Sequence, residues 1–216
     1  MRIDWMPYSA SALVVGATAL SVGAVLVPQV GLTSTPVAAV EVRSTGLLTV
    51  SLLYSVASVA LVLGLPAVLS IFDVRGARTA LAGAGFFVVG CFGTAAYAVL
   101  LAVYRALRLG EVFTGELRDL AADLGLSAIL YAWVLGFAIG ELLLALALVQ
   151  ARRVPRWVPG LLVMHVGLTP LAPVLPEPLV VMVALLVTVA FSALGIVANQ
   201  RTLLTGTRVG AHSLTS

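Results

Sequence analysis

Apolar and polar positions do not alternate along this chain; long apolar segments are separated by short polar ones. A helix needs about 20 apolar residues to cross the hydrocarbon layer of a membrane. Six segments approach or exceed that length: residues 9–27, 47–71, 81–104, 124–149, 158–175 and 179–198. Backbone N–H and C=O groups find no water inside a bilayer, so each segment must be helical, and the missing alternation argues against a barrel. The pattern predicts an all-α, polytopic transmembrane bundle of six spans.

Composition supports this interpretation. Hydrophobic residues make up 61% of the 216 residues and charged residues 10%, and the mean hydropathy is +1.14. Soluble domains carry about 25% charged residues, so water cannot be the solvent for this surface. Residues 1–200 are predicted to form one membrane domain, and residues 201–216, rich in Thr, Ser and Gly, a flexible cytoplasmic tail.

The longest connection carries a helical pattern of its own. Phe113, Leu117 and Leu120 recur at helical spacing, with Thr114 as a candidate N-cap. Residues 113–123 are therefore predicted to form an amphipathic helix on the membrane surface. A water-exposed extension of the fourth span is the alternative.

The first apolar segment has two interpretations. A basic residue, Arg2, precedes it, and the small residues 37–39 resemble a signal-peptidase site. A signal peptide has an apolar core of about 7–15 residues with the cleavage site close behind it. Here the core is longer and the small residues lie farther away, which favours a retained helix.

The arginines predict the orientation, because basic residues concentrate in cytoplasmic segments. With the N-terminus inside, the inner segments hold eight arginines and the outer segments four. The inner set is Arg2, Arg75, Arg78, Arg152, Arg153, Arg156, Arg201 and Arg208, and the outer set is Arg43, Arg105, Arg108 and Arg118. Trp5 and Trp157 fall beside the predicted inner face, where interfacial aromatic residues are common. Both termini are therefore predicted to be cytoplasmic.

Small residues indicate how the helices pack, because close approach replaces the hydrophobic effect inside lipid. The first span carries a stripe of small residues and the fourth a GxxxG pair: Ala12, Gly16, Ala19, Gly23, Gly136 and Gly140. Prolines predict helix breaks at Pro66 in the second span and at Pro170 and Pro173 in the fifth. Paired broken helices in corresponding positions are also typical of inverted-repeat transporters, although the two halves share no residue-level similarity.

Two ionisable side chains other than Cys and Tyr lie well inside the spans, Glu141 and His165. Each lies eight residues from the predicted inner boundary, which is about 12 Å at 1.5 Å per residue. Because the fourth and fifth spans are antiparallel neighbours, the two groups are expected at one depth. Thr169, one turn beyond His165, is a candidate to orient the imidazole. Thr18, Cys91 and Thr188 are expected at a similar depth, which would create a small polar layer.

This pair supports two hypotheses. An isolated charge in mid-membrane costs at least about 2.5 kcal/mol, so a hydrogen bond, an ion pair or a proton on Glu141 is expected. The structural hypothesis is a polar clamp that fixes the pairing of the fourth and fifth spans. The functional hypothesis is a proton-responsive or substrate-binding site.

Sequence motifs for chemistry are missing. There is no HExxH, CxxC, phosphate-binding glycine loop or nucleophile elbow. Glu141 and His165 alone are too few ligands for a metal, so no metal and no cofactor are expected. The single cysteine, Cys91, excludes an intrachain disulfide. Asp73 is expected to pair with Arg75 or Arg78, and the scattered arginines argue against a nucleic-acid partner.

Three features resemble the uncharacterised six-helix inner-membrane proteins of GC-rich bacteria. They are Met1-Arg2 before the first span, Arg75-Gly76-Ala77-Arg78 before the third and Arg152-Arg153 after the fourth. The resemblance implies a multi-pass protein of the bacterial cytoplasmic membrane and supplies no catalytic residues.

The leading functional hypothesis is a non-enzymatic bundle or accessory subunit. Its partners would be membrane lipids and either a second copy of the chain or a membrane subunit. A small proton-linked transporter using Glu141 and His165 is the first alternative. A membrane enzyme in which the same two residues act as acid and base on a lipid-soluble substrate is the second.

Overall fold

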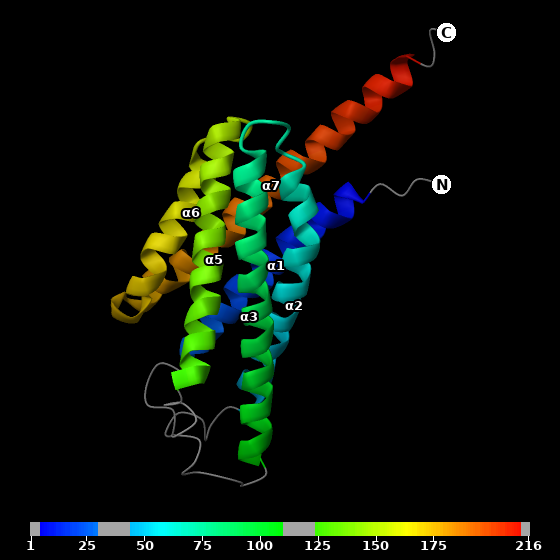
Figure 1. Ribbon diagram of the computed structural model, residues 1–216. Helices are drawn as coiled ribbons and strands as arrows, with labels where there is room; N and C mark the ends of the chain where they lie inside the picture. The colour runs from blue at the N-terminus through cyan, green and yellow to red at the C-terminus, as the bar shows by residue number, and fades with distance from the viewer. Residues whose placement is uncertain (1–4, 30–43, 110–123, 213–216) are drawn as a thin grey trace.

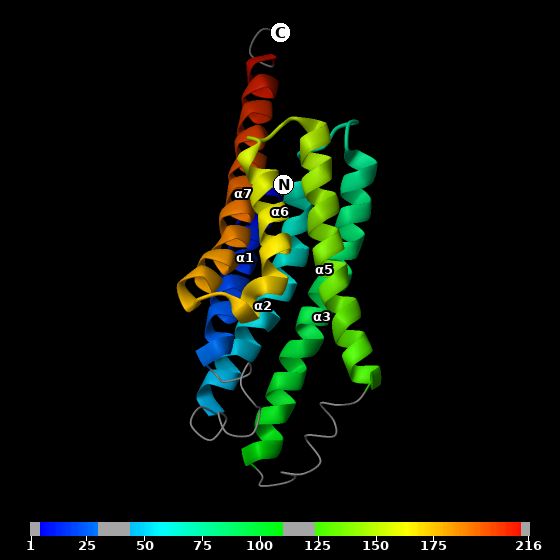
Figure 2. The ribbon, with the colours of Figure 1, turned by 90° about the vertical axis from the view of Figure 1, so that its left-hand side faces the viewer.

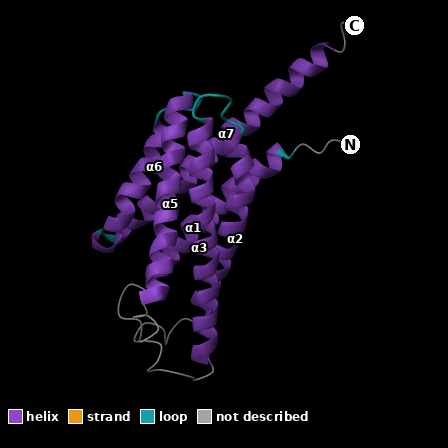
Figure 3. Ribbon diagram, in the orientation of Figure 1, coloured by secondary structure: helices purple, strands orange, loops and turns teal. Residues whose placement is uncertain are grey.

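The computed structural model describes residues 5–29, 44–109 and 124–212, and over these residues it contains helices and turns with no strand. The elements are α1 (Met6–Gln29), α2 (Ser44–Leu69), α3 (Ala77–Leu109), α5 (Leu124–Ala151), α6 (Trp157–Leu168), the 3₁₀ helix η1 (Thr169–Val174) and α7 (Glu177–His212). Figure 3 shows this all-helical composition. The all-α class is confirmed. The predicted surface helix, residues 113–123, lies outside the described residues.

Five of these helices, α1, α2, α3, α5 and α7, are long and apolar enough to cross a membrane. Between 33% and 44% of the residues in each crossing segment are buried inside the bundle. The remaining positions point outward and are largely apolar, among them Leu52, Leu63, Leu81, Phe92, Met182 and Ile196. Such a surface needs lipid as its solvent. The chain is therefore a multi-pass membrane protein.

The helices form a closed ring. Each helix packs against the next one in the chain, and α7 returns to contact α1 and α2. Figure 1 and Figure 2 show that the α2–α3 and α5–α6 turns lie together at one end of this bundle. The pairs α1–α2 and α3–α5 make the most extensive contacts. The ring thus consists of two tight helix pairs that meet directly between α2 and α3 and are joined on the other side by α6 and α7.

The fifth predicted span, residues 158–175, is helical over nearly its whole length but is not one α-helix. Its α-helical part, α6, has 12 residues, about 18 Å at 1.5 Å per residue, so α6 alone is shorter than the roughly 30 Å of hydrocarbon. The chain then continues as the six-residue 3₁₀ helix η1. Pro170 and Pro173 explain the change, because neither ring nitrogen can donate the hydrogen bond that continues an α-helix.

Pro66 does not break its helix, contrary to the prediction. Helix α2 runs through it to Leu69, and Ser9 of α1 inserts its hydroxyl into the next turn. The Ser9 hydroxyl donates to the Leu63 carbonyl at 2.8 Å and accepts from the Ala67 N–H at 3.0 Å. The inserted hydroxyl gives both backbone groups a partner where the proline interrupts the helical ladder. This turn lies close to α1, because a Cβ at Gly64 would be 2.7 Å from the Leu13 Cα.

The last helix is also longer than predicted. The sequence predicts a span that ends at residue 198 and a flexible tail from residue 201, whereas α7 continues to His212. Its last turns extend beyond the rest of the bundle (Figure 1). Residues 201–212 contain no proline. Gly206 and Gly210 each destabilise a helix by about 1 kcal/mol, but neither prevents helical geometry.

Candidate functional site

Glu141 and His165 meet inside the bundle. Helix α5 carries Glu141 and α6 carries His165, and the His165 Nδ1 lies 2.8 Å from the Glu141 Oε2. The Glu141 side chain is 0% exposed and the His165 side chain 16%. The short 152–156 turn makes α5 and α6 antiparallel neighbours, as the sequence requires. The sequence does not define how the two helices are rotated about their axes. In the structure, this rotation turns the two side chains toward each other.

The surroundings of Glu141 are almost entirely apolar. The large core cluster includes the neighbouring α5 residues Leu144 and Leu148 and, from α3 and α7, Phe87 and Phe191. The two phenylalanine rings lie 5.4 Å apart. Cys91 of α3 belongs to the same cluster. The carboxyl group therefore lies in a medium of low dielectric constant, where its partners matter most.

One oxygen of this carboxyl group lacks a partner. Within the described part of the chain, Glu141 Oε1 accepts no hydrogen bond. The Nδ1–Oε2 contact fits a neutral acid donating to a neutral imidazole, and equally a carboxylate accepting from an imidazolium. These two forms hold the same number of protons and differ only in the position of the shared one. An unpaired buried oxygen costs more when it carries charge.

Thr169 does not have the role that the sequence predicts. Its hydroxyl donates to the main-chain carbonyl of His165 at 2.7 Å rather than to the imidazole. This is the usual back-bond of a helical threonine to the preceding turn. Thr169 therefore helps to end α6 and leaves the imidazole to be oriented by Glu141.

The expected polar layer is split into separate sites. Thr18 donates to the Val14 carbonyl of its own helix. Thr188 instead joins Ser21, with 2.6 Å between the two hydroxyl oxygens, and also donates to the Ala17 carbonyl at 3.0 Å. Cys91 lies in the core cluster that also contains Phe87 and Leu144. The Ser21–Thr188 contact, which fastens α1 to α7, was not predicted, because hydroxyl residues within apolar runs usually bond to their own helix.

The small residues that were predicted to mediate helix packing do lie where helices meet. A Cβ added to Gly140 would be 2.5 Å from the Phe87 nitrogen, and one at Gly136 would be 3.3 Å from Val89, so α5 packs on α3 through both. Gly16 lies against the α2 backbone at Leu61, and Gly23 against the Tyr54 ring. Ala19 is buried and Ala12 half-buried on the same helix. The GxxxG pair thus serves packing within one chain.

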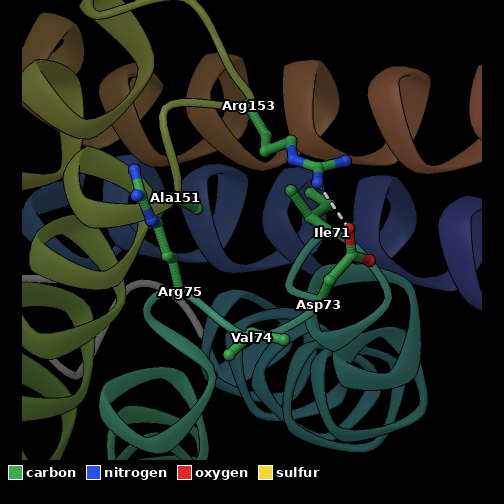
Figure 4. Close-up of a pocket in the computed structure, with 6 residues that line it drawn as sticks. All are labelled: Ile71, Asp73, Val74, Arg75, Ala151 and Arg153. Atoms are coloured by element: carbon green, nitrogen blue, oxygen red, sulfur yellow. Dashed lines mark ion pairs between the residues drawn. The ribbon is translucent and has the colours of Figure 1, made fainter.

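A pocket lies at the end of the bundle where the α2–α3 and α5–α6 turns meet. Figure 4 shows its lining residues: Ile71, Asp73, Val74, Arg75, Ala151 and Arg153. Asp73 pairs with Arg153 at 2.5 Å, so the expected pairing with Arg75 or Arg78 is wrong. The sequence favoured an arginine close to Asp73 in the chain. In the fold, the α5–α6 turn packs beside the α2–α3 turn and brings Arg153 to Asp73.

Metal ligands are not clustered: the described residues contain no group of three or more His, Cys, Asp or Glu side chains able to hold an ion. Glu141 and His165 are the one buried acid–base pair that those residues bring together.

Comparisons with known proteins gave no assignment: no protein-family model, no curated protein and no solved structure matches this chain.

Proposed function

We propose that this protein is a non-enzymatic, membrane-spanning helical bundle, acting alone or as an accessory subunit, in which Glu141 and His165 hold α6 against α5. The observation that carries the proposal is the complete burial of the Glu141 carboxyl group. A group that touches neither water nor an open cavity cannot exchange substrate without a rearrangement of the helices. It can, however, fix the rotation and depth of its neighbour.

The short helix has a particular need for such a contact. Helix α6 has only 12 residues, ends at the proline-containing η1 and buries only Val158, Pro159 and Leu162. Inside lipid, apolar side chains on α6 gain no hydrophobic stabilisation from packing on α5 rather than on acyl chains. A hydrogen bond in a medium of low dielectric constant supplies the specific attraction that they lack.

A small proton-linked transporter is the second candidate, and the unpaired Glu141 Oε1 favours it. Ionisable residues inside membrane spans commonly mark proton pathways. A carboxyl group with a free lone pair next to an imidazole provides two sites between which a proton can move. This candidate requires a second conformation in which water reaches Glu141.

Proton flux through liposomes tests both candidates. Purified protein is reconstituted into liposomes that contain a pH-sensitive dye, and an acid pulse is applied outside. For the bundle we expect acidification inside at the rate of empty liposomes, within about twofold, for both the wild type and Glu141→Gln, because the Glu141 carboxyl group is completely buried. Glu141→Gln should also keep the elution profile of the wild type, since glutamine preserves shape and hydrogen-bonding capacity.

The control is Gln150, whose side chain lies near the turn end of α5. Gln150→Glu adds a carboxyl group there without touching the buried pair. Faster acidification by the wild type that Glu141→Gln removes and Gln150→Glu retains would refute the sealed bundle in favour of the transporter. Aggregation of Glu141→Gln alone would show that the carboxyl group itself is needed for folding.

The location is also part of the proposal. The eight arginines of the predicted inner segments support a bacterial cytoplasmic membrane with both termini inside. The partners are then the surrounding lipids together with a second copy or a membrane subunit, and no nucleic acid is involved.

A further inference from the structure

The pocket at the turn end of the bundle has the character of an anion site. It has a volume of about 330 Å³, within the range of about 300–1,000 Å³ that is usual for small-ligand pockets. Two guanidinium groups line it, from Arg75 in the α2–α3 turn and Arg153 in the α5–α6 turn. Val74, which is 87% exposed, adds an apolar edge. A pocket with this lining suits a ligand that has both a charged and an apolar part.

Charge in the two turns is unbalanced. Asp73 is the one acidic residue, and it is paired with Arg153. Arg75 makes no ion pair with any of the described residues, and Figure 4 shows its side chain extending past Ala151, away from Asp73. The same turns and their flanking helix ends also carry Arg78, Arg152 and Arg156, all exposed. Arg75 therefore lies in a region where positive charge exceeds negative charge.

Contacts between the α2–α3 turn, the start of α3 and the end of α5 hold the pocket in shape. Gly76 has a φ of +78°, and a Cβ there would be 2.6 Å from the Ala147 carbonyl oxygen. Thr79 donates to the side chain of Gln150 at 3.1 Å. These contacts fix the α2–α3 turn on the last two turns of α5, so the arginines project from a rigid base. Glycine is required at position 76 by both its φ and the lack of space.

We propose that this pocket binds the phosphate group of an anionic phospholipid headgroup, with Arg75 as the principal ligand. The turns lie where the crossing helices end, which is the depth of the headgroups. Basic pockets between transmembrane helices recognise such headgroups, and a guanidinium group matches two phosphate oxygens at once. A free phosphate ion offers the same chemistry, so the test separates the two sources. The proposal is independent of the role of Glu141.

Titration of detergent-purified protein with short-chain phosphatidylglycerol, followed by native mass spectrometry, tests the assignment. Phosphatidylcholine, which has the same phosphodiester but no net charge because of its choline cation, is the lipid reference, and inorganic phosphate is the soluble source. We expect phosphatidylglycerol to bind at least about fivefold tighter than phosphatidylcholine, and Arg75→Gln to remove most of this difference, since one interfacial arginine contributes about 1 kcal/mol. Arg156→Gln is the matched control, because Arg156 lies on the same surface but does not line the pocket.

Asp73→Asn provides an independent check, because it releases Arg153 and should tighten phosphatidylglycerol binding by about twofold or more. Binding of inorganic phosphate that depends on Arg75 in the same way, with no binding of phosphatidylglycerol, would assign the site to a soluble phosphate and refute the headgroup. Equal weakening by Arg75→Gln and Arg156→Gln would show diffuse surface charge and overturn the pocket. The same conclusion would follow if phosphatidylglycerol had no advantage over phosphatidylcholine.

Discussion

His165→Leu is expected to lower the thermal stability of the purified protein by about 10 °C, the largest loss among single replacements in the polar core. Leucine fills a similar volume but offers no partner to Glu141 Oε2, which the imidazole contacts at 2.8 Å. Because Oε1 is already unpaired, both oxygens would then be buried without a hydrogen bond. Breaking a buried pair on one side costs about 3–5 kcal/mol, and each kcal/mol shifts the midpoint by about 2–4 °C in a chain of this size.

The double replacement Glu141→Leu with His165→Leu separates pairing from packing. Replacing both partners with apolar groups removes the unpaired atoms, so most of the lost stability should return. The melting midpoint in detergent is followed by tryptophan fluorescence, with Met164→Leu, on the outward face of α6, as the control. A His165→Leu midpoint equal to that of Met164→Leu would show that the pair does not stabilise the fold. Failure of the double variant to recover would assign the loss to packing around the imidazole.

Gly140→Ala is expected to destabilise the protein strongly, although it adds only one methyl group to the contact between α3 and α5. The new Cβ would lie 2.5 Å from the Phe87 nitrogen and 2.7 Å from its Cα. These are backbone atoms, so α3 as a whole must move away from α5. Overpacking of this kind costs about 1–3 kcal/mol, and the shift would also disturb the Phe87–Phe191 contact between α3 and α7.

Gly85→Ala is the matched control for this replacement. Gly85 lies on α3, one of the two helices in the same contact, and a Cβ there would have nothing within 4 Å. The change should be neutral or stabilise the helix by up to about 1 kcal/mol. Melting midpoints of the two variants in one detergent give the comparison. Equal midpoints would contradict the close approach of α3 and α5 at Gly140.

The membrane class of the fold could be predicted from the sequence because it depends on local composition. Apolar runs such as residues 47–71 are helical wherever lipid surrounds them, and α2 occupies nearly the same residues. The residues at which the helices end were harder to predict. Whether a proline ends a helix depends on whether another helix supplies hydrogen-bond partners to the backbone. The Ser9 hydroxyl of α1 supplies them near Pro66, whereas α6 ends before Pro170.

The site could be predicted in part. Counting residues from the predicted boundary placed Glu141 and His165 at one depth, because rise per residue in a helix is constant. Which side chains meet depends also on rotation and tilt, which pattern alone does not define. For this reason Thr18 and Thr188 were expected near the pair but belong elsewhere. The Asp73–Arg153 contact joins residues 80 positions apart, a distance at which spacing carries no information.

The central claim is that lipid, not water, surrounds the outward faces of α1, α2, α3, α5 and α7. Extraction of cell membranes with alkaline sodium carbonate, followed by mild detergent, tests it most directly, since carbonate releases proteins held only at the surface. We expect the full-length chain to remain in the carbonate-washed pellet and to enter solution only with detergent. Recovery of monodisperse protein in the carbonate or detergent-free buffer fraction would contradict the account.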